Sequence, residues 1–78
     1  MAEPIRCVLE WEYADEAKAR AVQQALAPDD AGFVRSRTEG PRLIAEIEGR
    51  SPMSLLHSIE DYLACLAVAE QAVDAARA

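Results

Sequence analysis

The stretch Ser51–Ala76 reads SPMSLLHSIEDYLACLAVAEQAVDAA and predicts one long helix. Ser51 is a favourable N-cap, because its hydroxyl can accept a hydrogen bond from an unpaired amide of the first turn. Pro52 follows at the first helical position, where its missing N–H group is not needed. Ala and Leu dominate the stretch after Pro52, and neither Gly nor Pro interrupts it. Helix propensity therefore favours a single element roughly 36 Å long.

This helix is predicted to be apolar on two sides. One side has the spacing of a face that covers a sheet, and it consists of Leu55, Ile59, Tyr62, Leu63, Leu66 and Val73. The other side is small and mostly apolar, and it consists of Met53, His57, Ala64, Ala67, Val68, Gln71 and Ala75. A helix that is apolar on two sides usually packs on two sides, which predicts a partner helix from another chain. The alternative is an Ala-rich helix whose exposed outer face has no functional consequence.

Two elements are predicted in the first third of the chain. Alternating hydrophobicity predicts a strand over Pro4–Tyr13, and its apolar side consists of Ile5, Cys7, Leu9, Trp11 and Tyr13. Asp15 can cap a helix that runs from Glu16 to about Ala27 and stops before Pro28. The narrow apolar side of this helix consists of Ala19, Val22, Ala25 and Leu26.

A hairpin is predicted in the middle of the chain. Its strands are Phe33–Glu39 and Arg42–Gly49, and Gly40-Pro41 forms the turn between them. The resulting order of strand, helix, strand, strand, helix predicts an α+β fold with two layers, in which two helices cover one face of a three-stranded antiparallel sheet. Residues 1–78 are predicted to form a single domain, and a domain this small is often stabilised by oligomerisation.

Composition restricts the class of protein. The chain has 78 residues and a formal net charge of −6, from 14 acidic and 8 basic residues. This balance argues against broad, non-specific binding of nucleic acids, which needs a basic surface. The two cysteines, Cys7 and Cys65, have no spaced partners and are expected to be small, partly buried apolar residues in a reducing cytoplasm. No apolar run approaches the roughly 18 residues of a membrane span.

Four arginines gather around the predicted hairpin, and they are Arg35, Arg37, Arg42 and Arg50. They are half of the 8 basic residues of an acidic chain, which makes them the candidate contact for RNA or another anion. The alternative is that they pair across the strands with Glu10, Glu46 or Glu48, which would contribute only a few tenths of a kcal/mol per pair. Both interpretations remain open at the level of the sequence.

The residues of a catalytic or metal site are not recognisable. His57 has Asp61 four residues later, which could orient a base, but a solvent-exposed or interface histidine is the better interpretation. Cys7, His57 and Cys65 lack the spacing of zinc ligands, and the isolated glycines form no phosphate-binding loop. The segment Pro28–Gly32 is a turn, and its two aspartates lack the further ligands of a calcium loop. No catalytic residue, metal site or cofactor is therefore predicted.

Three stretches carry a resemblance to a known family. They are LAPDDAGFVRSRTEG (Leu26–Gly40), PRLIAEIEGRSPMSLLHSIEDYL (Pro41–Leu63) and ACLAVAEQ (Ala64–Gln71). Together they resemble the small subunit of the KEOPS complex, the Pcc/CTAG-type family, over nearly the whole chain. The combination of the PD-x-x-G turn, the SR-x-EG hairpin and the SL…I-x-DYL helix is typical of this family.

The resemblance implies a non-enzymatic protein that forms homodimers through its strands. Each copy would hold one threonylcarbamoyltransferase subunit, and the assembly would make threonylcarbamoyladenosine in tRNA. The helices of this chain would join helices of that catalytic subunit, which assigns partner binding to Met53, His57, Ala64, Val68 and Gln71. Arg35 and Arg37 lie at the SR region and would contact tRNA within the complex. The alternative function is a stand-alone RNA-binding module that uses the arginines of the hairpin.

Overall fold

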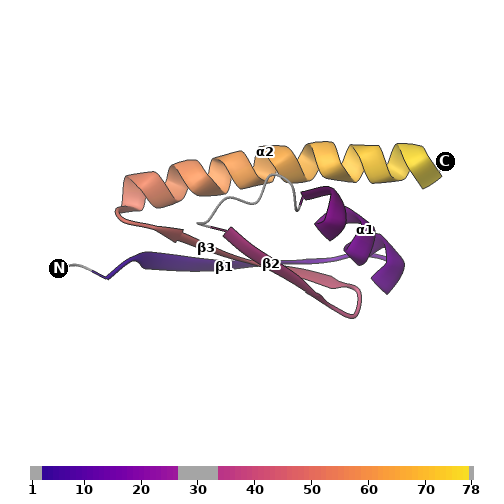
Figure 1. The fold of residues 1–78 in the computed structure, drawn as a ribbon, viewed down its shortest axis with the longest axis horizontal. Coiled ribbons are helices and arrows are strands. Elements are labelled where there is room, and N and C mark those ends of the chain that lie inside the picture. The colour runs from indigo at the N-terminus through magenta and orange to yellow at the C-terminus, as the bar shows by residue number, and fades with distance from the viewer. Residues whose placement is uncertain (1–2, 27–33, 78) are drawn as a thin grey trace.

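The computed structural model describes residues 3–26 and 34–77. The elements in these ranges follow the predicted order (Figure 1). They are the strands β1 (Ile5–Glu12), β2 (Val34–Glu39) and β3 (Arg42–Gly49), and the helices α1 (Glu16–Leu26) and α2 (Pro52–Arg77). The strands form one antiparallel sheet in the order β1-β3-β2, and both helices cover the same face of it. The predicted α+β fold is confirmed.

β3 lies in the centre of the sheet and pairs with both other strands. Leu43 lies opposite Trp11 of β1 and Thr38 of β2, so these three side chains share the face that the helices cover. Because successive side chains of a strand alternate between faces, Ile44 and Glu46 lie on the opposite, open face. The register therefore decides which residues are in the core and which form the charged side of the sheet.

A two-residue turn joins β2 to β3 at Gly40-Pro41. Gly40 has a φ of 59°, which suits the first central position of a type II′ hairpin turn and which L side chains rarely adopt. The carbonyl of Pro41 accepts a hydrogen bond from the backbone N–H of Tyr13, with an N···O distance of 2.9 Å. The turn is therefore also held by the segment that follows β1.

Two serines fix the start of α2: Ser51 is the predicted N-cap, and Ser54 was not assigned a part in the cap. The backbone N–H of Ser54 donates to Ser51 Oγ at 3.1 Å, and the N–H of Ser51 is bonded in turn to Ser54 Oγ at 3.0 Å. This reciprocal pair satisfies two amides that an uncapped helix would leave unpaired. Gly49 precedes it, and a Cβ atom there would lie 2.6 Å from the backbone N of Leu55. The close approach between β3 and α2 requires glycine at this position.

Asp15 caps α1, which confirms the predicted role of this residue. Its Oδ1 accepts a hydrogen bond from the backbone N–H of Lys18 at 2.8 Å. Within the described residues α1 ends at Leu26. The predicted final residue Ala27, the turn Pro28–Gly32 and Phe33 all lie outside the described ranges.

The hydrophobic core lies between the helices and β3. Its buried members are Val22, Leu26, Leu43, Ala45, Ile47, Tyr62, Leu66, Ala69 and Val73. Trp11 packs against this cluster, and its ring centroid lies 5.9 Å from that of Tyr62. Cys7 and Cys65 are half-buried free thiols, in agreement with the prediction that they are partly buried apolar residues.

Three residues predicted for apolar faces are more exposed than expected. Leu63 is 43% exposed, because it follows the sheet-facing Tyr62 by one position and is therefore rotated by about 100° around the helix. Ala25 is exposed at the margin of α1, and Ile5 is 37% exposed at the start of an edge strand. Conversely, Ala69 is buried in the core, although the sequence analysis assigned it to neither side of the helix.

The C-terminal end of α2 extends past the sheet. A helix of 26 residues is about 39 Å long, whereas a strand of 8 residues spans about 27 Å. Polar contacts with the residue that follows β1 and with α1 hold this end of the helix. Tyr13 Oη donates to Glu70 Oε2 at 2.7 Å, and Lys18 Nζ lies 2.9 Å from Asp74 Oδ1. We call these four residues the Tyr13 clasp.

Candidate functional site

The outward side of α2 carries all five residues predicted to bind a partner. Met53, His57, Ala64, Val68 and Gln71 are all exposed, and we call them the docking strip. At 100° per residue they lie within about 60° of one another on the helix. Met53 is 62% exposed and Val68 is 66% exposed, so the strip leaves apolar side chains in water. The five residues therefore form one surface, and no described part of the chain covers it.

A groove runs beside the docking strip, between α1 and α2. Its volume is about 330 Å³, and it is lined by Ala25, Ala64, Cys65, Val68, Ala69 and Ala72. Every lining side chain is small, so the backbone of another helix could approach closely. Ala25 and Ala72 were not predicted to belong to the site. Their small size fits both a core and a surface position, so polarity alone could not reveal them.

Two further leucines of α2 extend the exposed apolar area beyond the docking strip. Leu56 is 46% exposed and Leu63 is 43% exposed. Sequence reasoning placed Leu63 in the core and did not assign Leu56. Both lie about 100–120° around the helix from Tyr62, so they remain exposed once α2 lies with Tyr62 against the core.

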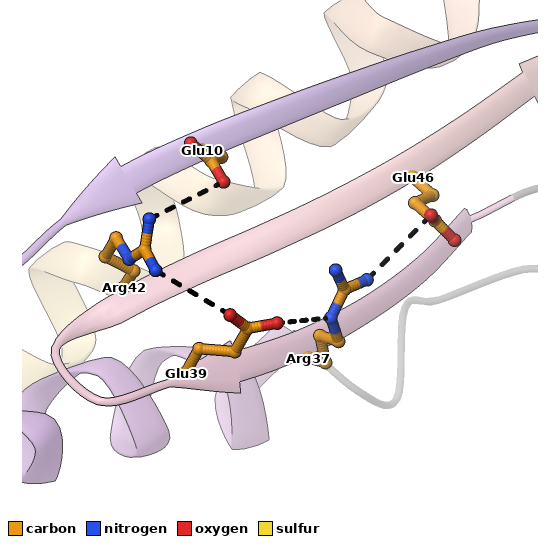
Figure 2. A network of polar contacts seen from close by, with 5 residues as sticks. All are labelled: Glu10, Arg37, Glu39, Arg42 and Glu46. Atoms are coloured by element: carbon orange, nitrogen blue, oxygen red, sulfur yellow. Dashed lines mark hydrogen bonds and ion pairs between the residues drawn. The ribbon is translucent and has the colours of Figure 1, made fainter.

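The open face of the sheet has the opposite character, because its charges are largely paired with one another. Arg42 lies 4.0 Å from Glu10 and 3.7 Å from Glu39, and Arg37 lies 3.0 Å from Glu39 and 3.8 Å from Glu46 (Figure 2). The resulting chain of charges crosses all three strands. A separate pair joins Arg6 to Glu48 at 2.9 Å.

The four arginines of the hairpin region therefore divide into two pairs. Arg37 and Arg42 are held by carboxylates, as the structural interpretation of the sequence anticipated. Arg35 and Arg50 form no ion pair with the described residues, and both are exposed. Arg35 lies on the open sheet face, opposite Glu46 in the register, whereas Arg50 lines a hollow at the start of α2. The structure does not bring the four arginines together as a single basic patch.

The described side chains offer little for catalysis. His57 is exposed on the docking strip, and no group of three or more potential metal ligands occurs among residues 3–26 and 34–77. Burial raises the pKa of Tyr13 well above its usual value, and the hydrogen bond to Glu70 and nearby negative charges add to the shift. The Tyr13 phenol is therefore a protonated hydrogen-bond donor at neutral pH. None of the helices in the described chain is both long and apolar enough to cross a membrane.

Comparison with known families gives one match. A model of the family described as "Transcription factor Pcc1" matches residues 6–74, which include every described strand and helix except the residues at the two ends. The curated proteins contain no match to the chain.

Proposed function

Since the chain belongs to the Pcc1 family, the family of the KEOPS small subunit, we propose that it is a non-catalytic assembly subunit in tRNA modification. In this function it binds the threonylcarbamoyltransferase subunit through the docking strip. Two copies of the chain associate through their strands and so bring together two catalytic subunits. The complex acts in the cytoplasm and supports the formation of threonylcarbamoyladenosine in tRNA.

The apolar docking strip is the single observation that carries this proposal. Val68 is 66% exposed in a strip that also contains Met53 and Ala64, and a groove of small side chains lies next to it. Exposed apolar residues scattered singly need no explanation, whereas a continuous apolar surface beside a groove is typical of a protein–protein contact.

The edges and the open face of the sheet are available for association of two copies of the chain. β1 and β2 are both edge strands, so either can pair with a second copy of the chain. The open face also carries Val8, which is 53% exposed among the charged residues. Both features lie away from the docking strip, because the helices cover the other side of the sheet. One copy can therefore associate through its strands and bind a catalytic subunit through its helices at the same time.

The proposal is tested by measuring binding to the purified catalytic subunit. Val68→Asp and Ala64→Glu place a charge on the docking strip, and each should weaken binding at least about 100-fold, which is roughly 2.7 kcal/mol. Both positions are exposed, so the free energy of unfolding should change by no more than about 0.5 kcal/mol. Calorimetric titration gives the affinity, and light scattering gives the mass of each assembly.

Ala17→Glu is the matched control. Ala17 is exposed on α1, and its position in the helix lies opposite the buried Ala19 and Leu26. This variant adds the same charge to the same helical layer and should retain the affinity of the wild type. The wild-type complex should contain two copies of each protein. Wild-type affinity in both strip variants would show that the catalytic subunit does not bind here, and a one-to-one complex would refute the bridging function.

A further inference from the structure

Four residues of the docking strip, all except Met53, belong to a longer row of exposed residues with the spacing of a helix–helix contact. His57, Asp61, Ala64, Val68, Gln71 and Ala75 follow one another at alternating intervals of four and three residues, and all six are exposed. This alternation keeps a row of side chains on one side of a helix over several turns, as in the contact between two helices of a coiled coil. We call these six residues the heptad row. Its geometry fits a partner that is itself a helix.

Asp61 differs from every other member of the heptad row, because it is the only one that carries a carboxylate. It forms no ion pair or hydrogen bond with the described part of the chain. The acids further along α2 are different, since Glu70 accepts a hydrogen bond from Tyr13 and Asp74 pairs with Lys18. A helix lying on the row would remove the Asp61 carboxylate from water. A carboxylate is strongly unfavourable in such a place unless a cation or several hydrogen bonds compensate for the lost hydration.

The charges of α2 decide which kind of chain can supply the compensating group. Glu60, Asp61, Glu70 and Asp74 are acidic, and residues 52–76 of this helix include no lysine or arginine. Two copies that met through the heptad row would bring two Asp61 carboxylates and no lysine or arginine into the contact, and each copy also has a net charge of −6. A second copy of the chain therefore does not suit the heptad row. The matching partner is a helix of a different protein that carries a basic side chain.

We propose that Asp61 determines the specificity of the docking site by pairing with a lysine or arginine on the partner helix. This inference rests on the proposed function, because it concerns the same surface. Ala64 and Val68 provide apolar contact, but small apolar side chains alone discriminate weakly between neighbouring alignments of two helices. One polar residue in such a row fixes the alignment, because only one register places its partner opposite. Asp61 thus selects both the partner and the register.

The test compares two charge reversals at adjacent positions of α2. Asp61→Arg and Glu60→Arg change the net charge equally, but Glu60 is not a member of the heptad row and borders it on the side opposite Asp61, where a side chain at the rim of the contact stays in water. Titration against the purified catalytic subunit should give an affinity at least about 30-fold weaker for Asp61→Arg, because an ion pair in the contact is replaced by a repulsive one. Glu60→Arg should weaken the affinity less than about threefold. Thermal unfolding verifies that both variants are folded.

A reciprocal substitution identifies the partner group. Each lysine and arginine on the docking helix of the catalytic subunit is changed to glutamate, and one of these variants should bind Asp61→Arg within about fivefold of the wild-type affinity. Equal losses for Asp61→Arg and Glu60→Arg would overturn the inference, because they would indicate only a general attraction between charged surfaces. Val68→Asp in the same titration separates the two proposals. If Val68→Asp abolishes binding while the two charge reversals behave alike, the docking function stands and only the role of Asp61 is refuted.

Discussion

The open face of the sheet and the outward side of α2 are both exposed, yet they are built differently. On the sheet, Arg37 and Arg42 are each held by two carboxylates, and the chain of ion pairs crosses all three strands. On the helix, Met53 and Val68 are more than half exposed, and Asp61 has no described partner. The first surface satisfies most of its own interactions, whereas the second leaves apolar area exposed and the Asp61 carboxylate without a described partner.

This difference shows why the charge of a surface is a poor guide to whether it binds something. The arginines of the hairpin were the natural candidate for a binding site in an acidic chain. The register instead places Arg37 beside Glu39 and Glu46, where its charge is largely neutralised. A surface of small, nearly uncharged side chains attracts less notice in a sequence. It is nevertheless the surface that gains more from contact with another protein, because burial of apolar area is favourable.

The largest effect on the free energy of unfolding is expected within β3, where Ile47 and Ile44 lie on opposite faces of the sheet. Ile47 is fully buried in the core, and Ile47→Ala should lower the free energy of unfolding by about 3–4 kcal/mol. Ile44 is 3% exposed on the open face, where its neighbours across the strands are Glu10 and Arg37. Their flexible stems can close over a gap, so Ile44→Ala should lower the free energy by only about 1–2 kcal/mol.

Urea denaturation at several protein concentrations measures both variants. Equal losses would mean that the open face is packed as firmly as the main core, and the contrast between the two surfaces would then be wrong. An effect of Ile44→Ala that increases with protein concentration would place Ile44 in the contact between two copies of the chain. The loss in free energy of unfolding for Ile47→Ala should not change with protein concentration, provided that the association state of the chain stays the same.

Much of the fold could be predicted because local signals agree with one another. Ser51 and Asp15 cap the two helices as expected, and alternating hydrophobicity predicts each strand to within a few residues. The rotation of α2 over the sheet could not be predicted as well. Leu63 and Tyr62 are both suited to a core, and only the direction from which α2 meets β3 decides that Tyr62 is buried and Leu63 is exposed.

The candidate site was predicted only in part, for similar reasons. The five residues of the docking strip are exposed as expected, because their spacing separates them from the sheet-facing side. Alanines cannot be assigned from polarity, so the burial of Ala69 and the exposure of Ala25 emerged only from the packing. Ion pairs depend on the register of the strands, and no pattern in the sequence decides which of Arg35 and Arg37 receives a carboxylate.

A smaller effect on the free energy of unfolding is expected from substitution in the Tyr13 clasp, which holds the half of α2 that bears Val68 and Gln71. Tyr13→Phe removes the hydrogen bond to Glu70 and should lower the free energy of unfolding by about 1 kcal/mol at pH 7. The hydrogen bond between Tyr13 and Glu70 joins the residue after β1 to α2 and does not involve the open face, so the variant should leave the paired arginines undisturbed. Lys18 Nζ, 5.9 Å from the centre of the Tyr13 ring, retains its pairing with Asp74 in this variant.

The stabilisation from the Tyr13 hydroxyl should also depend on pH in a defined direction. The pKa of Tyr13 is raised in the folded state, chiefly by burial, so folding favours the neutral phenol. This contribution is complete below the unfolded pKa of about 10 and is lost as the pH rises further, because the unfolded chain then releases the proton first. The difference between wild type and Tyr13→Phe should therefore be constant from pH 7 to 9 and narrow above pH 10. Urea midpoints that keep the same separation up to pH 11 would contradict this assignment.

The smallest effect is expected from the arginines of β2, which test whether the open face contributes to RNA binding. Arg35 and Arg37 lie two residues apart on the same face, but only Arg37 is held by carboxylates. We propose that Arg35 contacts a tRNA phosphate within the assembled complex. Arg35→Ala should then weaken tRNA binding by about threefold and reduce the salt dependence by about one phosphate contact. Arg37→Ala should weaken binding less, because Arg37 would have to leave Glu39 and Glu46 to reach a phosphate.

Fluorescence anisotropy with labelled tRNA and the complete complex, at a series of salt concentrations, distinguishes the two arginines. Equal losses would show that the ion pairs do not restrain Arg37, and the open face would then be a general basic contact despite its carboxylates. No loss in either variant would exclude the open face from RNA binding. Tight, steeply salt-dependent binding of tRNA by the isolated chain would instead favour a stand-alone RNA-binding module. In that case the open face of the sheet, and not the docking strip of α2, would be the surface that defines the function.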